Sequence, residues 1–180
     1  NIGNQVLKQL TCLYNLRQVD RYLYTDLKPA NVLYYCEDET PIKVQLADLG
    51  SAVPRKSSSW NCISTYPAPE YRGPEYKISP HRQGFFKANI GYRAECGRIL
   101  SYQLGFLIIA LVKKPEDLRN FEFNSVFDKE EHTNLEAKAE KILPGLSHFI
   151  KEDPKKRINI LDRKYKDKTF GDILKEASKK

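Results

Sequence analysis

The stretch that decides the fold runs from residue 24 to residue 50 and reads YTDLKPANVLYYCEDETPIKVQLADLG. Its middle holds two runs of β-branched and apolar residues, 32–35 and 42–47, separated by the acidic segment 36–41. Two short apolar runs joined by an acidic turn predict a β-hairpin. Polar residues of the kind that carry out catalysis stand on both sides of this hairpin, so its base is the first place to look for a site.

Four side chains around the base of the hairpin carry this chemistry. Asp26, Lys28 and Asn31 fall within six residues of sequence, and Asp48 follows the second strand beside Gly50. The set suits phosphoryl transfer, because an Asp accepts the proton of an attacking hydroxyl and a Lys neutralises phosphoryl charge. An Asn and a second Asp provide the oxygen ligands that Mg²⁺ prefers. Gly50 is expected to let the backbone turn sharply past Asp48.

The rest of the chain reads as helices around one long loop. Apolar residues recur at helical spacing from about residue 6 to residue 24 and again over 134–150. A continuous apolar run predicts a helix over 99–112, and a weaker pattern predicts a final helix over 170–177. The segment 50–97 is rich in Ser, Pro, Gly and Tyr and is expected to be mostly loop. The fold class is therefore mainly α with a small β-hairpin, and the hairpin is the only sheet expected.

Composition sets outer limits on function. The chain has 180 residues, 41% hydrophobic and 29% charged, which fits one globular domain rather than a disordered segment. Its net charge is +7, but eleven basic and six acidic residues lie in 151–180, so we expect a solvated basic end and no nucleic-acid partner. The apolar run 99–112 is too short for a transmembrane segment. The four cysteines stand 24, 26 and 34 residues apart, which is not zinc-ligand spacing.

On these residues the chain resembles the C-terminal lobe of a eukaryotic-type Ser/Thr protein kinase. The catalytic loop of that family is matched by Asp26, Lys28 and Asn31, and its magnesium motif by Asp48-Leu49-Gly50. Lys28 follows the Ser/Thr rather than the tyrosine branch. The resemblance implies one kinase C-terminal lobe over 1–180, divided into a catalytic loop (24–33), a magnesium motif (48–50), an activation segment (48–75), an insertion (about 76–97) and a helical subdomain (98–180).

The resemblance also implies a role for each matched residue. Asp26 would be the general base, and Lys28 would stabilise the transferring phosphate. Asn31 and Asp48 would hold Mg²⁺ or Mn²⁺. ATP would be the co-substrate, with its adenine against residues from the two strands of the hairpin, namely Leu33 and Ala47.

Partners follow from the same resemblance. A protein substrate is expected, together with an N-terminal kinase lobe supplied by the same or another chain, because the glycine-rich loop and the strand Lys of the family have no match in this sequence. The phrases TDLKP (25–29) and ADLG (47–50), followed by YRGPE (71–75), look closest to kinases that phosphorylate Arg/Ser-rich splicing factors. Secreted rhoptry kinases of apicomplexan parasites are a second candidate relative. Either Glu70 or Glu75 would end the activation segment and pair with Arg157.

Some positions depart from the family pattern. Tyr24 and Thr25 replace the usual His and Arg before the catalytic Asp, and Leu100 stands where an anchoring Asp is expected. These departures leave a pseudokinase, acting as a binding or scaffold protein, as the alternative to an active kinase. Small-molecule kinases fit less well, because they usually lack a Lys at the position of Lys28.

Overall fold

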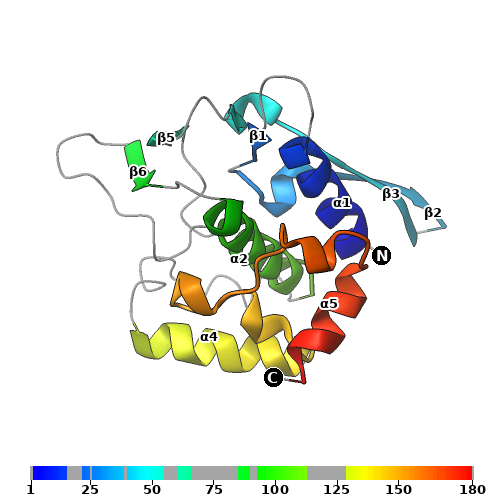
Figure 1. Cartoon of the computed structure of the whole chain (residues 1–180). Coiled ribbons are helices and arrows are strands. Elements are labelled where there is room, and N and C mark those ends of the chain that lie inside the picture. The colour runs from blue at the N-terminus through cyan, green and yellow to red at the C-terminus, as the bar shows by residue number, and fades with distance from the viewer. Residues whose placement is uncertain are drawn as a thin grey trace.

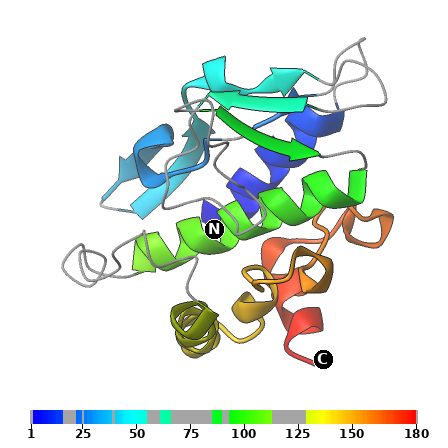
Figure 2. The ribbon, with the colours of Figure 1, turned by 90° about the vertical axis from the view of Figure 1, so that its left-hand side faces the viewer.

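A central helix organises the described part of the chain. The structure, a computed structural model, describes residues 2–15, 22–24, 26–38, 40–54, 61–65, 85–89, 93–112 and 129–179. Its α-helices are α1 (Ile2–Asn15), α2 (Arg93–Val112), α4 (Lys129–Ile142) and α5 (Phe170–Ala177). Helix α2 runs through the middle, with α1 and the strands on one side and α4 and α5 on the other (Figures 1 and 2).

The strands in the described residues form three antiparallel pairs. The pairs are β1 (Tyr22–Leu23) with β4 (Val53–Pro54), β2 (Val32–Glu37) with β3 (Thr40–Leu46), and β5 (Asn61–Thr65) with β6 (Phe85–Asn89). Single 3₁₀ turns lie between the larger elements: η1 (Pro29–Asn31), η2 (Leu49–Ser51), η5 (Leu146–His148), η6 (Pro154–Lys156) and η7 (Arg163–Tyr165). The predicted fold class, mainly α with a small β-hairpin, is confirmed at this level, and the hairpin is β2–β3.

Two helix predictions extended too far. The pattern from residue 6 to residue 24 gives α1 only to Asn15, and Leu23 is instead buried in β1, opposite Val53 of β4. The pattern over 134–150 gives α4 only to Ile142, and Gly145 then takes a φ of 87°. Pro144 precedes that glycine, and a proline cannot continue a helix without losing a hydrogen bond. The final helix over 170–177 is confirmed as predicted.

The expectation of a single sheet was wrong. Within the predicted loop 50–97, β4 pairs with β1, and β5 pairs with β6 in a register that places Asn61 opposite Asn89. Helix α2 also begins at Arg93, six residues before the predicted start at residue 99. These strands pair across intervals that show no alternating pattern of apolar and polar residues, so no local feature predicts them.

Two glutamines fasten the hairpin to the helical body. Gln5 and Gln9 of α1 reach the outer edge of β3, where Gln5 Oε1 accepts the N–H of Val44 at 2.9 Å. Gln9 donates to the carbonyl of Val44 at 2.7 Å and accepts the N–H of Leu46 at 2.9 Å. The backbone groups of this edge are therefore satisfied by α1, which fixes the direction in which β3 runs toward Asp48.

The core is apolar and centred on α2, whose residues from Cys96 to Ile109 are buried except for the half-buried Arg98. Gly105 allows this close packing, because a Cβ there would lie 2.6 Å from Ile150 Cγ2 and 2.9 Å from Phe149 Cβ. Among the helices in the described residues, none combines the length and the apolar character needed to cross a bilayer.

Candidate active site

The loop between β1 and β2 holds three of the predicted site residues in one turn. Leu27 is fully buried and anchors the loop, and Pro29 begins the 3₁₀ turn η1, where its missing N–H costs nothing. The N–H of Asn31 then donates to the carbonyl of Lys28 at 3.0 Å. The turn brings the side chains before and after it to the same place.

Asp26, Lys28 and Asn31 are in direct contact. Asn31 Nδ2 donates to both the backbone carbonyl and Oδ2 of Asp26, at 2.9 Å each. Lys28 Nζ lies 3.0 Å from the same Oδ2. Asp26 and Asn31 are buried while Lys28 keeps 30% of its side chain exposed, so the carboxylate is fixed in place and the cation lies at the surface.

Asp48 is joined to this cluster through Ala47 and Tyr24. The N–H of Ala47 donates to the carbonyl of Asn31 at 2.9 Å, and the Tyr24 hydroxyl donates to the carbonyl of Ala47 at 2.7 Å. The end of β3 is thus hydrogen-bonded to both ends of the 24–31 loop. Of the predicted residues, Asp26, Lys28, Asn31 and Ala47 are brought together by these contacts, with Asp48 one residue further on.

The pKa of the Tyr24 hydroxyl is shifted by its burial and by the charged groups of the site. Burial raises its pKa from the ordinary value of 10.0 to about 12. A hydrogen bond with Asn31 acts in the lowering direction, and the nearby charges of Asp26 and Asp48 act in the raising direction. Both carboxylates are therefore close enough to the same buried hydroxyl to affect its ionisation. Sequence reasoning treats Tyr24 only as a departure from the family pattern and misses this hydrogen bond.

The backbone at Asp48 takes the turn that had been expected of Gly50. Asp48 has φ 52° and ψ 60°, in the left-handed region, whereas Gly50 lies within η2 without a positive φ. Asp is one of the residue types that tolerate this region. A Cβ at Gly50 would lie 3.4 Å from Asp48 Oδ1, which is an ordinary contact, so space does not require a glycine there either. The expected role of Gly50 is corrected in this respect, and the sharp turn places the Asp48 carboxylate at the surface.

The donor set fits a hard cation such as Mg²⁺. The side-chain hydrogen bonds of Asn31 to Asp26 both use Nδ2, so Asn31 Oδ1 can act as an acceptor, and Asp48 adds an exposed carboxylate. An amide oxygen and a carboxylate are ligands of the type that Mg²⁺ takes while it keeps several waters. Within the described ranges, no cluster of three or more His, Cys, Asp or Glu side chains is placed to hold a metal.

The predicted adenine-contacting face lies beside this cluster and is open. Leu33 is 56% exposed, and Tyr34 and Tyr35 after it are 61% and 68% exposed. Together with Lys43 and Gln45 they line a hollow of about 450 Å³ on the hairpin. Side chains alternate between the two faces of a strand, so Leu33 and Tyr35 share one face and Tyr34 lies on the other. Large exposed apolar side chains of this kind indicate a surface that meets another molecule or segment.

Arg157 is buried against α2. Its Nε donates to the carbonyl of Lys151 at 2.5 Å, its Nη2 donates to that of Glu152 at 3.1 Å, and its guanidinium stacks on Tyr102 at 4.4 Å. The predicted partner, Glu70 or Glu75, lies outside the described residues. The same holds for most of the activation segment after residue 54 and of the insertion at 76–97, apart from the backbone of β5 and β6 and residues 93–97 of α2.

Comparison with known proteins gives no assignment: no protein-family model matches the chain, and no curated protein matches it.

Proposed function

We propose that the chain is the catalytic C-terminal lobe of a protein Ser/Thr kinase, which transfers the γ-phosphate of ATP to a protein hydroxyl. The observation that carries the proposal is the contact of Asp26 with both Asn31 and Lys28. A buried carboxylate, a cation on the same oxygen and an amide at a metal-binding position are the parts that phosphoryl transfer needs.

Each residue has one task in this proposal. Asp26 accepts the proton of the attacking hydroxyl, and its position is held by the two hydrogen bonds from Asn31. Lys28 lies 3.0 Å from Asp26, so its ammonium also stands next to the oxygen that receives the phosphate and offsets the charge there. Asn31 and Asp48 hold Mg²⁺ or Mn²⁺, which supplies charge neutralisation to the phosphates when bound.

The open hairpin face supports a second lobe as the partner of this chain. Leu33 would lie under the adenine of ATP, with Ala47 at the inner end of the same hairpin. The exposed Tyr35, two residues after Leu33 in β2, lies on the same face of the strand and extends this apolar surface. We propose that a lobe bearing the glycine-rich loop and the strand Lys, from the same or another polypeptide, covers this face.

A pseudokinase remains a second candidate on one observation. Leu100, at the position where the family carries an Asp that orients the catalytic loop, is 1% exposed and packed in the core. The contacts of Tyr24 and Asn31 with Ala47 hold the loop in its place by another route. If that route does not suffice, the chain would bind ATP and partners without transferring phosphate.

The two candidates separate in an assay of phosphate transfer. The complete polypeptide that contains this chain is incubated with labelled ATP, Mg²⁺ and a Ser-rich protein substrate, and compared with Asp26→Asn and Asp48→Asn. We expect a loss of about 10²- to 10⁴-fold for Asp26→Asn, as for a general base. Asp38→Asn, in the exposed turn of the hairpin, is the matched control and keeps full activity.

Each result assigns one candidate. Transfer that both site variants lose and the control keeps supports the kinase. Metal-dependent ATP binding without transfer by the unchanged protein supports the pseudokinase and refutes the kinase. Full transfer by Asp26→Asn would contradict the role given to Asp26.

A further inference from the structure

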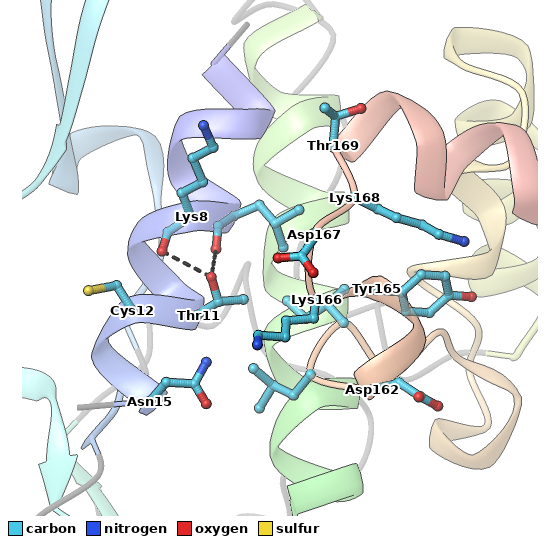
Figure 3. Close-up of a pocket in the computed structure, with 13 residues that line it drawn as sticks. Lys8, Thr11, Cys12, Asn15, Asp162, Tyr165, Lys166, Asp167, Lys168 and Thr169 are labelled. Carbon is cyan, nitrogen blue, oxygen red and sulfur yellow. Dashed lines mark hydrogen bonds between the residues drawn. The ribbon is translucent and has the colours of Figure 1, made fainter. Parts of the chain in front are cut away.

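Beyond the proposed active site, the described residues form a cavity and a free strand edge. The cavity, of about 480 Å³, lies between α1 and the segment 160–169 that leads into α5 (Figure 3). Lys8 and Lys166 extend to opposite ends of it, and Asp162 and Asp167 balance their charge. The cavity therefore favours no class of ligand, whereas the strand edge restricts its partner by the direction of its backbone groups.

In the part of the chain that the structure describes, the outer edge of β2 presents unpaired backbone groups. Strand β2 pairs with β3 alone, and their hairpin extends beyond α1, away from the helical body (Figure 1). The N–H and C=O of Val44 in β3 bond to Gln5 and Gln9 of α1, so they point away from β2. Tyr34, opposite Val44 in this antiparallel pair, therefore points its own N–H and C=O away from β3.

Strand β2 lacks the features that usually keep an edge strand from pairing. From Val32 to Cys36 it contains neither a charged residue nor a proline, and a charge appears only at Glu37. The residue left over at the register shift of the hairpin is Ile42, which belongs to β3, so β2 itself stays regular. A regular, uncharged strand with exposed aromatic side chains is a template on which another strand can pair.

The opposite edge of the hairpin is already closed, which favours a second copy of the chain as the partner. In β3, Gln5 and Gln9 bind the outward backbone groups of Val44 and the N–H of Leu46. Two copies joined through β2 would form a four-stranded sheet in the order β3–β2–β2–β3, with both outer strands covered by α1. Such a pair has two-fold symmetry and cannot extend into a filament. A single bound peptide strand would instead leave its own outer edge unpaired.

We propose that two copies of the chain pair antiparallel through the outer edges of β2, with Tyr34 of one copy opposite Tyr34 of the other. Each Tyr34 then donates its N–H to the C=O of the other Tyr34. Leu33 of each copy lies opposite Tyr35 of the other on one face, and the two Tyr34 rings meet on the other face. The next register, with Tyr35 opposite Tyr35, would place the Glu37 carboxylate against Leu33.

Sedimentation velocity of the complete polypeptide that contains this chain, over a range of micromolar concentrations, tests this proposal. We expect the unchanged protein to show a reversible equilibrium of monomer and dimer. Tyr34→Pro removes an N–H that β3 does not use, and it should weaken association by about 30-fold, since the dimer loses two hydrogen bonds. Gln45→Thr, on the exposed face of β3, is the matched control and leaves association unchanged.

A pair of charged variants tests the register without altering the backbone. Tyr34→Glu and Tyr34→Lys each place two like charges opposite one another at the two-fold axis, so each alone should associate more weakly than the unchanged protein. Mixed in equal amounts, the two variants should associate about 2- to 30-fold more tightly than either alone, because opposite charges then face each other.

The proposal is overturned if the unchanged protein stays monomeric, if Gln45→Thr weakens association as much as Tyr34→Pro, or if mixing the charged variants restores nothing. A monomer whose Tyr34 amide exchanges its hydrogen slowly would show that another segment or protein covers the edge, which also overturns it. Circular dichroism checks that each variant is folded, and if Tyr34→Pro is not, the mixed charged variants decide the outcome.

Discussion

Replacing Tyr24 by Phe removes a hydroxyl that joins the start of the catalytic loop to the end of β3. In the unchanged protein this hydroxyl donates to the Ala47 carbonyl at 2.7 Å from a buried ring. Leaving that carbonyl without its donor is expected to cost about 1–3 kcal/mol of unfolding free energy. With a urea dependence of about 2 kcal/mol per M, a loss of 2 kcal/mol moves the unfolding midpoint by about 1 M.

The same variant is expected to alter the response to alkaline pH. Because the pKa of Tyr24 is raised from 10.0 to about 12 in the folded protein, its contribution to stability is complete below pH 10 and is lost as pH rises toward 12. Between pH 8 and pH 11 the unfolding free energy of the unchanged protein should therefore fall by about 1.4 kcal/mol more than that of Tyr24→Phe. The difference in stability between the two proteins is thus smaller at pH 11.

Urea unfolding at both pH values, followed by circular dichroism, measures this gap. Tyr34→Phe, whose ring is 61% exposed, is the control and should change stability by less than about 0.5 kcal/mol at either pH. An unchanged midpoint in Tyr24→Phe at pH 8, or a gap that is the same at pH 8 and pH 11, would refute the reasoning.

Three further predictions concern stability and are checked by urea unfolding. Gly105→Ala should lower the unfolding free energy by about 1–3 kcal/mol although Ala is the better helix former, because the new Cβ would clash with Phe149 and Ile150. Gly171→Ala is the control, since its new Cβ would meet only an ordinary contact at 3.8 Å, and it should be neutral or stabilising. Equal effects of the two substitutions would contradict the close packing at Gly105. Thr169→Ala breaks the capping box of α5 and should cost about 0.5–2 kcal/mol, with no loss counting against the cap. Partial burial acts to raise the pKa of Glu140, but hydrogen bonds from Ser147 and a backbone N–H outweigh it and lower that pKa below 4.5. Its contribution is thus present above pH 4.5 and lost as pH falls through the lowered pKa, so Glu140→Gln should flatten the acid dependence of stability, and an unchanged dependence would contradict this.

The parts of the fold that were predicted correctly depend on local patterns. The hairpin follows from two apolar runs around an acidic turn, and α5 follows from its apolar spacing, with a capping box that Thr169 and Asp172 complete. Leu23 was misassigned because its burial comes from pairing with β4, thirty residues further along the chain. Periodicity cannot distinguish a helical Leu from one buried by a distant strand.

In the candidate site too, contacts within one turn could be predicted from sequence, whereas contacts between distant segments could not. Asp26, Lys28 and Asn31 could be grouped from sequence because one turn of six residues contains them. The hydrogen bond between Tyr24 and Ala47 spans 23 residues and could not be predicted from sequence, because it depends on how α1 directs β3. The contact of Gln5 and Gln9 with β3 is only weakly indicated by the sequence, in which they are two polar residues four apart at the border of the apolar face of α1. The cavity beside α5 joins residues 7–15 to 160–169 and has no counterpart in any local pattern.

The central claim is that Asp26, held by Asn31 and paired with Lys28, serves phosphoryl transfer. The most direct measurement is the ratio of kcat/KM for phosphate transfer from ATP–Mg²⁺ between the unchanged complete polypeptide and its Asp26→Asn variant. The account predicts measurable transfer and a ratio of about 10² or more, with both proteins equally folded. No transfer by the unchanged polypeptide, or a ratio near one, would contradict it.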